Sequence, residues 1–153
     1  MSKNGAVTAE TMWEQIVAAA DQIRSNYDQQ LRRKHGLTLT QVEALSVLTA
    51  HPEGVRVVDL ARGLRAATGN TTRLVDRMVR DDLAERASHP GDRRALLVKA
   101  TTQGRAAQRK ASPTLAGLAQ KLGELLSDKE VRDLHRIFLR LRGAFGDPAR
   151  EAE

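Results

Sequence analysis

The 153-residue chain contains no cysteine, which excludes disulfides, thiolate metal sites and thiol-based redox switches. Aromatic residues make up only 3% of the chain, and no apolar run approaches the roughly 20 residues that a transmembrane helix needs. The polar segment that follows Met1 lacks the apolar core of a signal peptide. We therefore expect a cytoplasmic protein without a membrane partner, of a size suited to a single domain.

Motifs for metal binding and catalysis are also missing. The four histidines are His35, His51, His89 and His135, and none of them has a second ligand at metal-binding spacing. The sequence has no Gly-x-Ser-x-Gly elbow, no phosphate-binding loop and no cluster of paired carboxylates. We therefore expect no metal, no cofactor and no catalytic residue, and do not expect an enzyme.

Positive charge is present and is concentrated in the middle of the chain. The net charge is +6, and residues 56–105 carry 11 basic and 6 acidic side chains, which leaves +5 in that segment. The four aromatic residues all lie outside this segment, at Trp13, Tyr27, Phe138 and Phe145. The segment therefore offers no ring on which an unpaired base could stack. This distribution favours double-stranded DNA over RNA or single strands as the partner.

Helical periodicity predicts long helices at both ends of the chain. Residues 10–36 form the first, with an apolar stripe from Trp13 to Leu31 and Gly36 as its end. Residues 101–145 form two more, the first of them kinked or interrupted at Pro113. Three pairs have the spacing of a capping box and predict helix starts: Thr11 with Glu14, Thr40 with Glu43, and Ser127 with Glu130.

The middle of the chain predicts two short helices joined by a tight turn. A short strand over 55–57 precedes a helix of about two turns over 58–64, and Thr68 is placed to cap the next helix. One face of that helix is apolar, with Leu74, Val75, Met78 and Val79, and the opposite face carries Asn70, Arg73, Arg77 and Arg80. This organisation is typical of a helix-turn-helix, although a basic stripe alone could also be a solvated surface.

A β-hairpin is predicted directly after these helices. Residues 83–87 and 95–100 have strand composition, and Pro90-Gly91 marks the turn between them. The turn is followed by Asp92, Arg93 and Arg94, so the tip of the hairpin is basic. The predicted fold class is mainly α with a small β-hairpin wing.

Several stretches resemble the MarR (multiple antibiotic resistance regulator) family. The segment 72–78, Thr-Arg-Leu-Val-Asp-Arg-Met, is similar to the family's recognition helix, and 92–94, Asp-Arg-Arg, is similar to its wing signature. Thr101 with Gly104-Arg105 resembles the stretch that opens the family's fifth helix. Two positions depart from the family, Asp82 where glycine is usual and Ala100 where leucine is usual. Because Asp tolerates a left-handed backbone, we expect the turn at Asp82 to persist.

The resemblance implies a single domain over 1–153. A winged helix-turn-helix over 38–100 would be flanked by N- and C-terminal dimerisation helices over 10–36 and 101–145, with a loose tail over 146–153. It also implies a homodimer that binds a near-palindromic operator in double-stranded DNA and acts as a repressor. A small aromatic or phenolic effector would release the DNA.

The expected DNA contacts come from the recognition helix and the wing. Asn70 and Arg73 lie where recognition helices meet base edges, whereas Arg77 and Arg80 are suited to phosphates. The start of the helix adds Thr68, Thr71 and Thr72 as candidates. The resemblance implies that Arg93 and Arg94 reach the minor groove and that Asp92 orients one of them, although an exposed turn without a partner has the same composition.

The effector pocket and the class of function leave alternatives open. Trp13, Tyr27 and His51 are candidate effector contacts, and each could equally be ordinary packing. A nonspecific or architectural DNA-binding protein without an effector would share the basic face. An enzyme or a protein-binding winged helix is a third alternative, for which the discriminating feature would be a convergent set of titratable groups in a pocket, and the sequence indicates none.

Overall fold

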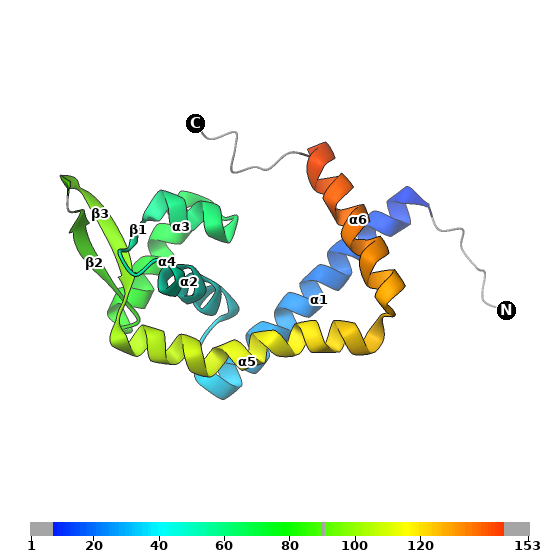
Figure 1. Ribbon diagram of the computed structural model, residues 1–153, viewed down its shortest axis with the longest axis horizontal. Helices are drawn as coiled ribbons and strands as arrows, with labels where there is room; N and C mark the ends of the chain where they lie inside the picture. The colour runs from blue at the N-terminus through cyan, green and yellow to red at the C-terminus, as the bar shows by residue number, and fades with distance from the viewer. Residues whose placement is uncertain (1–7, 90, 146–153) are drawn as a thin grey trace.

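The computed structural model describes residues 8–89 and 91–145. Helices α2, α3 and α4 gather with a three-stranded sheet at one end of the molecule, and α1, α5 and α6 extend away from them (Figure 1). The fold is mainly α with a small antiparallel sheet, as predicted. In chain order the elements are α1 (Ala9–His35), α2 (Leu39–Ala50), β1 (Val55–Arg56), α3 (Val57–Leu64), α4 (Thr68–Arg80), β2 (Ala84–His89), β3 (Asp92–Ala100), α5 (Thr102–Leu125) and α6 (Asp128–Phe145).

Helices α1, α2 and α6 begin with capping boxes, and the first two of these boxes differ from the prediction. Helix α1 is capped by Thr8 paired with Thr11, and not by Thr11 paired with Glu14. Helix α2 is capped by Thr38 paired with Gln41, so the predicted Thr40 and Glu43 box is also wrong. The predicted end of α1 at Gly36 is confirmed, with a left-handed φ of 68°.

The predicted capping box before α6 is present. The backbone amide of Ser127 donates to Glu130 Oε2 at 2.8 Å, and the amide of Glu130 donates to Ser127 Oγ at 3.4 Å. Hydrogen bonds from Ser127 hold the pKa of Glu130 below its ordinary value. Helix α5, by contrast, runs through Pro113 without the interruption that we considered.

The sheet has the strand order β1-β3-β2, with both pairings antiparallel. The predicted strand at 55–57 is shorter in the structure, because Val57 already begins α3. The hairpin of β2 and β3 is longer than predicted and extends to the pairing of His89 with Asp92. The wing is therefore attached to the helix-turn-helix through β1, which pairs Val55 with Val98 of β3.

The start of α5 is fixed against the turn that follows α4. Asp82 adopts a left-handed φ of 55°, as expected for this substitution of the usual glycine. Its carbonyl accepts a 2.6 Å hydrogen bond from Thr101 Oγ1, which in turn accepts one from the amide of Gly104. A Cβ atom at Gly104 would lie 1.9 Å from the carbonyl oxygen of Leu83, so this approach requires glycine. The segment resembling the family's fifth helix thus joins α5 to the wing.

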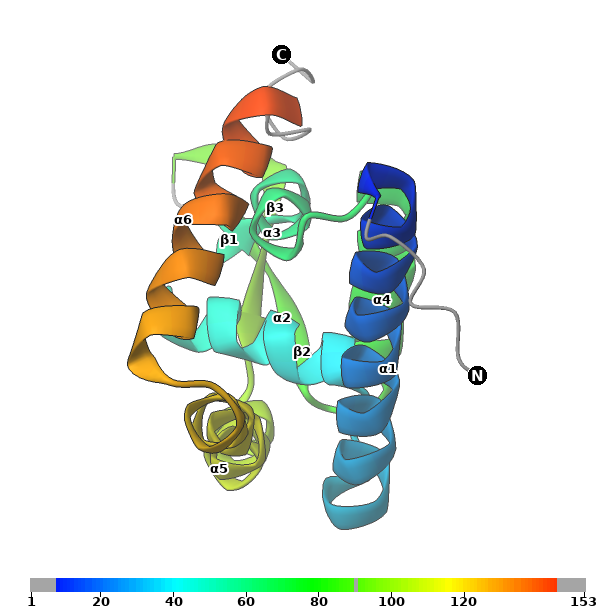
Figure 2. The ribbon, with the colours of Figure 1, turned by 90° about the vertical axis from the view of Figure 1, so that its right-hand side faces the viewer.

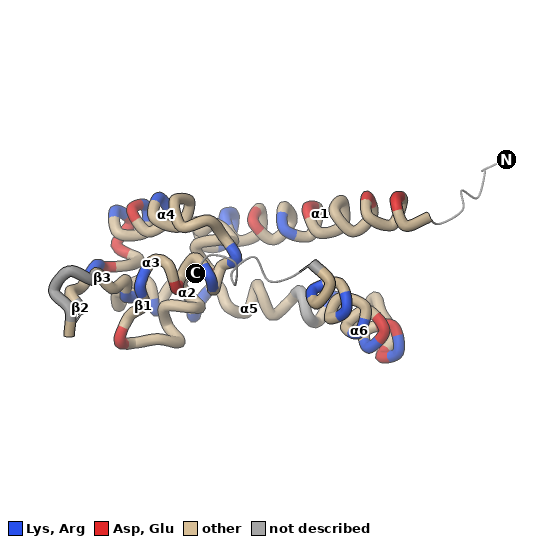
Figure 3. Tube along the Cα trace, turned by 90° about the horizontal axis from the view of Figure 1, so that it is seen from above, with Lys and Arg blue, Asp and Glu red and all other residues tan. Residues whose placement is uncertain are grey.

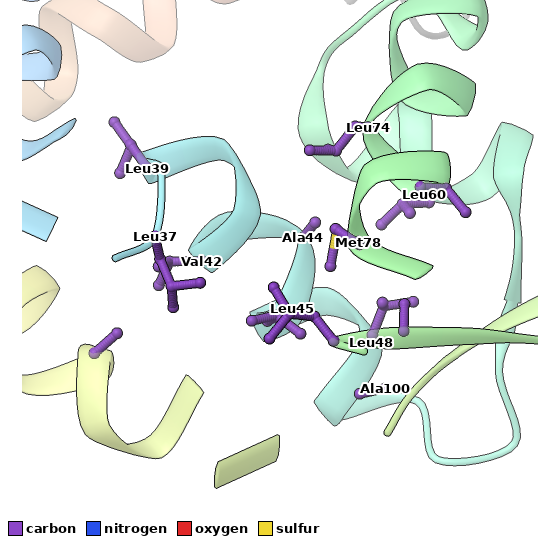
Figure 4. Close-up of a cluster of buried hydrophobic side chains, with 14 of the residues drawn as sticks. Leu37, Leu39, Val42, Ala44, Leu45, Leu48, Leu60, Leu74, Met78 and Ala100 are labelled. Carbon is purple, nitrogen blue, oxygen red and sulfur yellow. The ribbon is translucent and has the colours of Figure 1, made fainter. Parts of the chain in front are cut away.

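One apolar core holds the winged part together. In Figure 4 the side chains of Leu45, Leu48 and Met78 lie together between α2 and α4. Leu60 of α3 and Val98 of β3 belong to the same cluster and are fully buried. Each such side chain contributes about 1.5–3 kcal/mol through burial, so α4 is held rigidly by its apolar side.

The terminal helices leave much of their apolar surface exposed. Helix α6 extends from the end of α5, and Figure 2 shows it well separated from α1. The predicted apolar stripe of α1 is buried only toward the end of the helix: Tyr27 and Leu31 are buried, whereas Trp13 and Ile23 are exposed. No helix in the described part of the chain is long and apolar enough to span a bilayer. The exposed large apolar residues of α1 and α6 are Met12, Trp13, Val17, Ile23, Val131, Leu134, Ile137, Phe138, Leu139 and Leu141.

Candidate DNA-binding site

Helix α4 has one buried and one exposed side. Leu74, Val75 and Met78 are buried against α2 and α3, as predicted, whereas Val79 is exposed and does not join them. The exposed side carries the polar residues predicted to face DNA, which are Asn70, Arg73, Arg77 and Arg80. Basic positions recur along α4 from Arg73 to its end (Figure 3). Packing on one side thus presents the arginines on the other.

The three threonines of α4 have different environments. Thr71 is only 1% exposed, and its hydroxyl donates to the carbonyl of Ala67 at 3.2 Å, so its predicted role as a DNA contact is corrected to a core role. Thr72 is half-buried and Thr68 is exposed at the helix start. Thr68 belongs to the helix and does not cap it, because the N-cap is Ala67 and makes no side-chain bond.

The wing is connected to α4 by an ion pair. Arg86 of β2 donates to Asp76 of α4 with 2.7 Å between Nη2 and Oδ1. Sequence reasoning missed this pair, although Asp76 is the sole acidic residue within Thr68–Arg80 and so the natural partner for a nearby cation. The predicted wing residues Asp92, Arg93 and Arg94 lie in β3, but their side chains are outside the described part of the structure.

A second group of charges surrounds the start of α3. Asp59 accepts hydrogen bonds from Arg56 at 2.8 Å and from Arg62 at 3.0 Å. The bond from Arg56 is the main cause that lowers the pKa of Asp59 below its ordinary value. Arg65 follows at the turn between α3 and α4 in a left-handed conformation with φ of 51°. No sequence motif predicted a role for these arginines.

A cavity of about 850 Å³ lies between the terminal helices and the helix-turn-helix. Helices α1, α2 and α4, the end of α3 with the turn that follows it, and Leu115 of α5 form its wall. None of the predicted effector residues lines it. Trp13 and Tyr27 are 14 positions apart on α1, roughly 21 Å along a helix, and His51 Nδ1 bonds to the carbonyl of Val47. Within this chain, Trp13, Tyr27 and His51 do not form one pocket.

Among the described residues, no group of three or more His, Cys, Asp or Glu side chains could hold a metal ion. The exposed side of α4 instead presents Arg73, Arg77 and Arg80 beside the ion pair of Asp76 with Arg86. Such a surface is suited to electrostatic contact with a polyanion.

Comparison with known proteins agrees with this geometry. Residues 35–95 match the model of the MarR family. No curated protein matches the sequence. Among solved structures, Sco3205 of Streptomyces coelicolor, described as a MarR family transcriptional regulator in complex with DNA, superposes with a TM-score of 0.80 at 22% identity, covering 94% of this chain and 92% of that chain.

Two further structures share the same fold. The MepR–DNA complex of S. aureus has a TM-score of 0.79 at 20% identity, covering 92% of this chain and 99% of that chain. CouR of Rhodococcus jostii RHA1, bound to p-coumaroyl-CoA, has a TM-score of 0.75 at 19% identity, covering 90% and 95%. At these identities the structures show the shared fold, while the family match covers the helix-turn-helix and most of the wing. Residues 35–95 thus match the MarR family, and the chain as a whole has the winged-helix fold of DNA-binding transcriptional regulators of that family.

Proposed function

We propose that the protein is a cytoplasmic homodimeric repressor that binds a near-palindromic operator and releases it when a small aromatic or phenolic effector binds. The observation that carries the DNA-binding part is the exposed side of α4, where Asn70, Arg73, Arg77 and Arg80 project from a helix fixed by its buried side. Arginine near the start of such a helix can form two hydrogen bonds with guanine.

The exposed apolar residues of α1 and α6 support the dimer. Leu134, Phe138 and Leu141 lie on one side of α6 and are 38%, 46% and 36% exposed. A monomer that left this surface in water would expose a large apolar patch, which is characteristic of a protein interface. A second copy presents the same surface, and a two-fold axis would place two α4 helices in successive major grooves, roughly 34 Å apart.

The cavity supports an effector. Its volume of about 850 Å³ lies within the range of roughly 300–1,000 Å³ that is usual for small-molecule sites. The structure of CouR with p-coumaroyl-CoA shows that a protein of this fold holds an aromatic acyl ligand. Because the cavity wall includes both α1 and α4, a ligand there could change how the winged part sits relative to the terminal helices.

Selection of bound sites from random duplex DNA tests this function. We expect one enriched, near-palindromic site, and light scattering at micromolar concentration should report a dimer. Equal affinity for selected and random duplexes at the same salt concentration would instead favour the architectural alternative, which shares the basic face but reads no bases.

The wing gives a separate test of the same proposal. Replacement of Arg93 or Arg94 by Ala should weaken operator binding by about 1 to 3 kcal/mol without unfolding the protein. Fluorescence anisotropy with the selected duplex measures this change. Unchanged affinity in both variants would contradict the proposed contact of the wing with DNA.

A further inference from the structure

A second, smaller hollow lies where α1 and α5 pack against each other (Figure 1). Its volume is about 250 Å³, and Tyr27, Gln30 and Lys34 form the α1 side of its wall. The residues that α1 contributes to the larger cavity lie on another side of the helix, namely Arg24, Asp28 and Arg32. At about 100° per residue the two sets are centred roughly 130° apart around α1. The α1–α5 hollow is therefore a separate site, and no residue of the helix-turn-helix lines it.

Two lysines of the α1–α5 hollow have no acidic partner. Lys34 lies at the end of α1 and Lys121 lies on α5, and neither forms an ion pair within the described part of the chain. The nearest acids along the two helices, Asp28 and Glu124, are hydrogen-bonded to other side chains of their own helices. The wall of the hollow thus carries two positive charges and no carboxylate.

A tyrosine hydroxyl in the same wall has no hydrogen-bond partner. Tyr27 is only 5% exposed and packs in the core, yet its hydroxyl bonds to none of the residues that the structure describes. Among these residues no buried side-chain oxygen or nitrogen lacks a partner, so the hydroxyl of Tyr27 must reach solvent. Because Tyr27 lines the α1–α5 hollow, the hollow is where this oxygen becomes accessible. The core therefore fixes the ring and leaves its donor free.

The other polar side chains of the wall already have partners. Gln30 Nε2 donates to Asn26 Oδ1 at 2.6 Å, and Thr114 Oγ1 lies 3.0 Å from His35 Nε2. These two bonds keep the wall in place on its α1 and α5 sides. The donors that stay available to a ligand are therefore two ammonium groups and one phenolic hydroxyl.

We propose that the α1–α5 hollow binds a phosphate group, either as the free ion or as part of a small phosphate ester. A phosphate carries close to two negative charges near neutral pH and has three strongly accepting oxygens, which match the two lysines and the hydroxyl. The hollow is smaller than the roughly 300–1,000 Å³ of drug-sized sites, so it suits a small anion. Bound phosphate joins Lys34 of α1 to Lys121 of α5. This site lies outside the proposed function and does not depend on it.

Tyr27 is the only tyrosine of the chain, so isotope labelling of tyrosine at Cζ gives one NMR signal that reports the α1–α5 hollow. The full chain is titrated with inorganic phosphate and with glycerol phosphate, while chloride keeps the ionic strength constant and glycerol serves as the uncharged control. We expect a saturable shift of the Tyr27 signal with phosphate at roughly millimolar concentration, and none with glycerol. Tighter binding of glycerol phosphate would assign the site to esters, and equal or tighter binding of inorganic phosphate would assign it to the free ion.

Matched substitutions, measured by calorimetry, locate the bound phosphate. Lys34→Gln and Lys121→Gln should each weaken binding about tenfold, and Tyr27→Phe, which removes only the hydroxyl, about fivefold or more. The control is Lys110→Gln, which removes an unpaired lysine from the same side of α5 about three turns away, roughly 16 Å along the helix. It should change the affinity by less than about twofold. Circular dichroism checks that each variant is folded.

Three results would overturn the phosphate site. One is the absence of a saturable shift of the Tyr27 signal with either phosphate. Another is an equal loss of affinity in Lys110→Gln and Lys121→Gln, because binding would then follow overall charge and not the hollow. The third is an unchanged affinity in folded Tyr27→Phe, which would place the anion outside the hollow. If Tyr27→Phe does not fold, Lys34→Gln and Lys121→Gln still decide the matter, since both lysines are exposed.

Discussion

The winged part and the terminal helices of this chain use similar amphipathic helices but bury them to different extents. Leu45 and Leu48 of α2 are 0% and 1% exposed, because α4 and the sheet cover them. Phe138 of α6, on an equally regular stripe, is 46% exposed. The comparison indicates that the winged part is completed by its own chain, whereas the terminal helices need a further surface. It also separates the residues that determine folding from those that would form the proposed dimer.

The largest expected effect is a loss of stability when a side chain is removed from the core of the winged part. Leu45→Ala removes a fully buried side chain and should lower the free energy of unfolding by about 2 to 5 kcal/mol. The control is Val58→Ala on α3, where the side chain is 43% exposed and the change should stay within about 0.5 kcal/mol. Urea unfolding at one fixed protein concentration measures both. Similar losses in the two variants would contradict the burial described for Leu45.

The next effect concerns the terminal helices. Phe138→Ala should weaken the proposed dimer by about 2 kcal/mol or more, roughly thirtyfold in its dissociation constant, because an aromatic anchor of an interface is lost. Arg140→Ala removes a large side chain from the same helix outside this stripe and should leave the dimer intact. Sedimentation over a range of concentrations distinguishes them. Equal dissociation constants would show that the exposed stripe of α6 is not the interface.

The sequence was sufficient for the helix-turn-helix because its signals are local. The apolar spacing of Leu74, Val75 and Met78 and the arginines opposite them determine which side of α4 is buried, and the structure agrees. The two wrong capping boxes had correct local spacing as well. Thr8 precedes Thr11 by the same three residues that separate Thr11 from Glu14, so spacing alone could not locate the start of α1.

Other features depended on contacts that a sequence pattern does not contain. Thr71 is polar and lies at the start of a recognition helix, but its hydroxyl bonds to the carbonyl of Ala67, which permits its burial. The cavity combines residues from five helices, α1 to α5, with the turn after α3, and no periodicity connects them. The candidates Trp13 and Tyr27 share one helix in the sequence but point to different surroundings, since one is exposed and the other buried.

A smaller effect tests where DNA binds. Arg73→Ala should reduce affinity for the selected duplex by about 1 to 3 kcal/mol and relax the preference at one base position, because a base contact is lost. The matched control is again Arg140→Ala, the same change in a terminal helix, which should leave affinity nearly unchanged. Anisotropy titrations at two salt concentrations separate base readout from general attraction to phosphate. An equal loss in both variants would mean that DNA is held by overall charge and not by α4.

The smallest effect concerns the ion pair that connects β2 of the wing to α4, the two elements proposed to contact DNA. Arg86 and Asp76 are 36% and 50% exposed in their side chains, so solvent screens the pair and its loss should cost no more than about 0.2 to 1 kcal/mol of stability. The exposed pair of Lys129 and Asp133 on α6 lies within one helix and serves as the comparison. A double-mutant cycle measures each coupling energy by urea unfolding.

Because the Arg86 pair joins β2 to α4, Arg86→Ala should also reduce affinity for DNA, whereas Lys129→Ala should change only local helix stability. If Arg86→Ala and Lys129→Ala left DNA affinity equally unchanged, the position of the wing would depend on the sheet and the core alone.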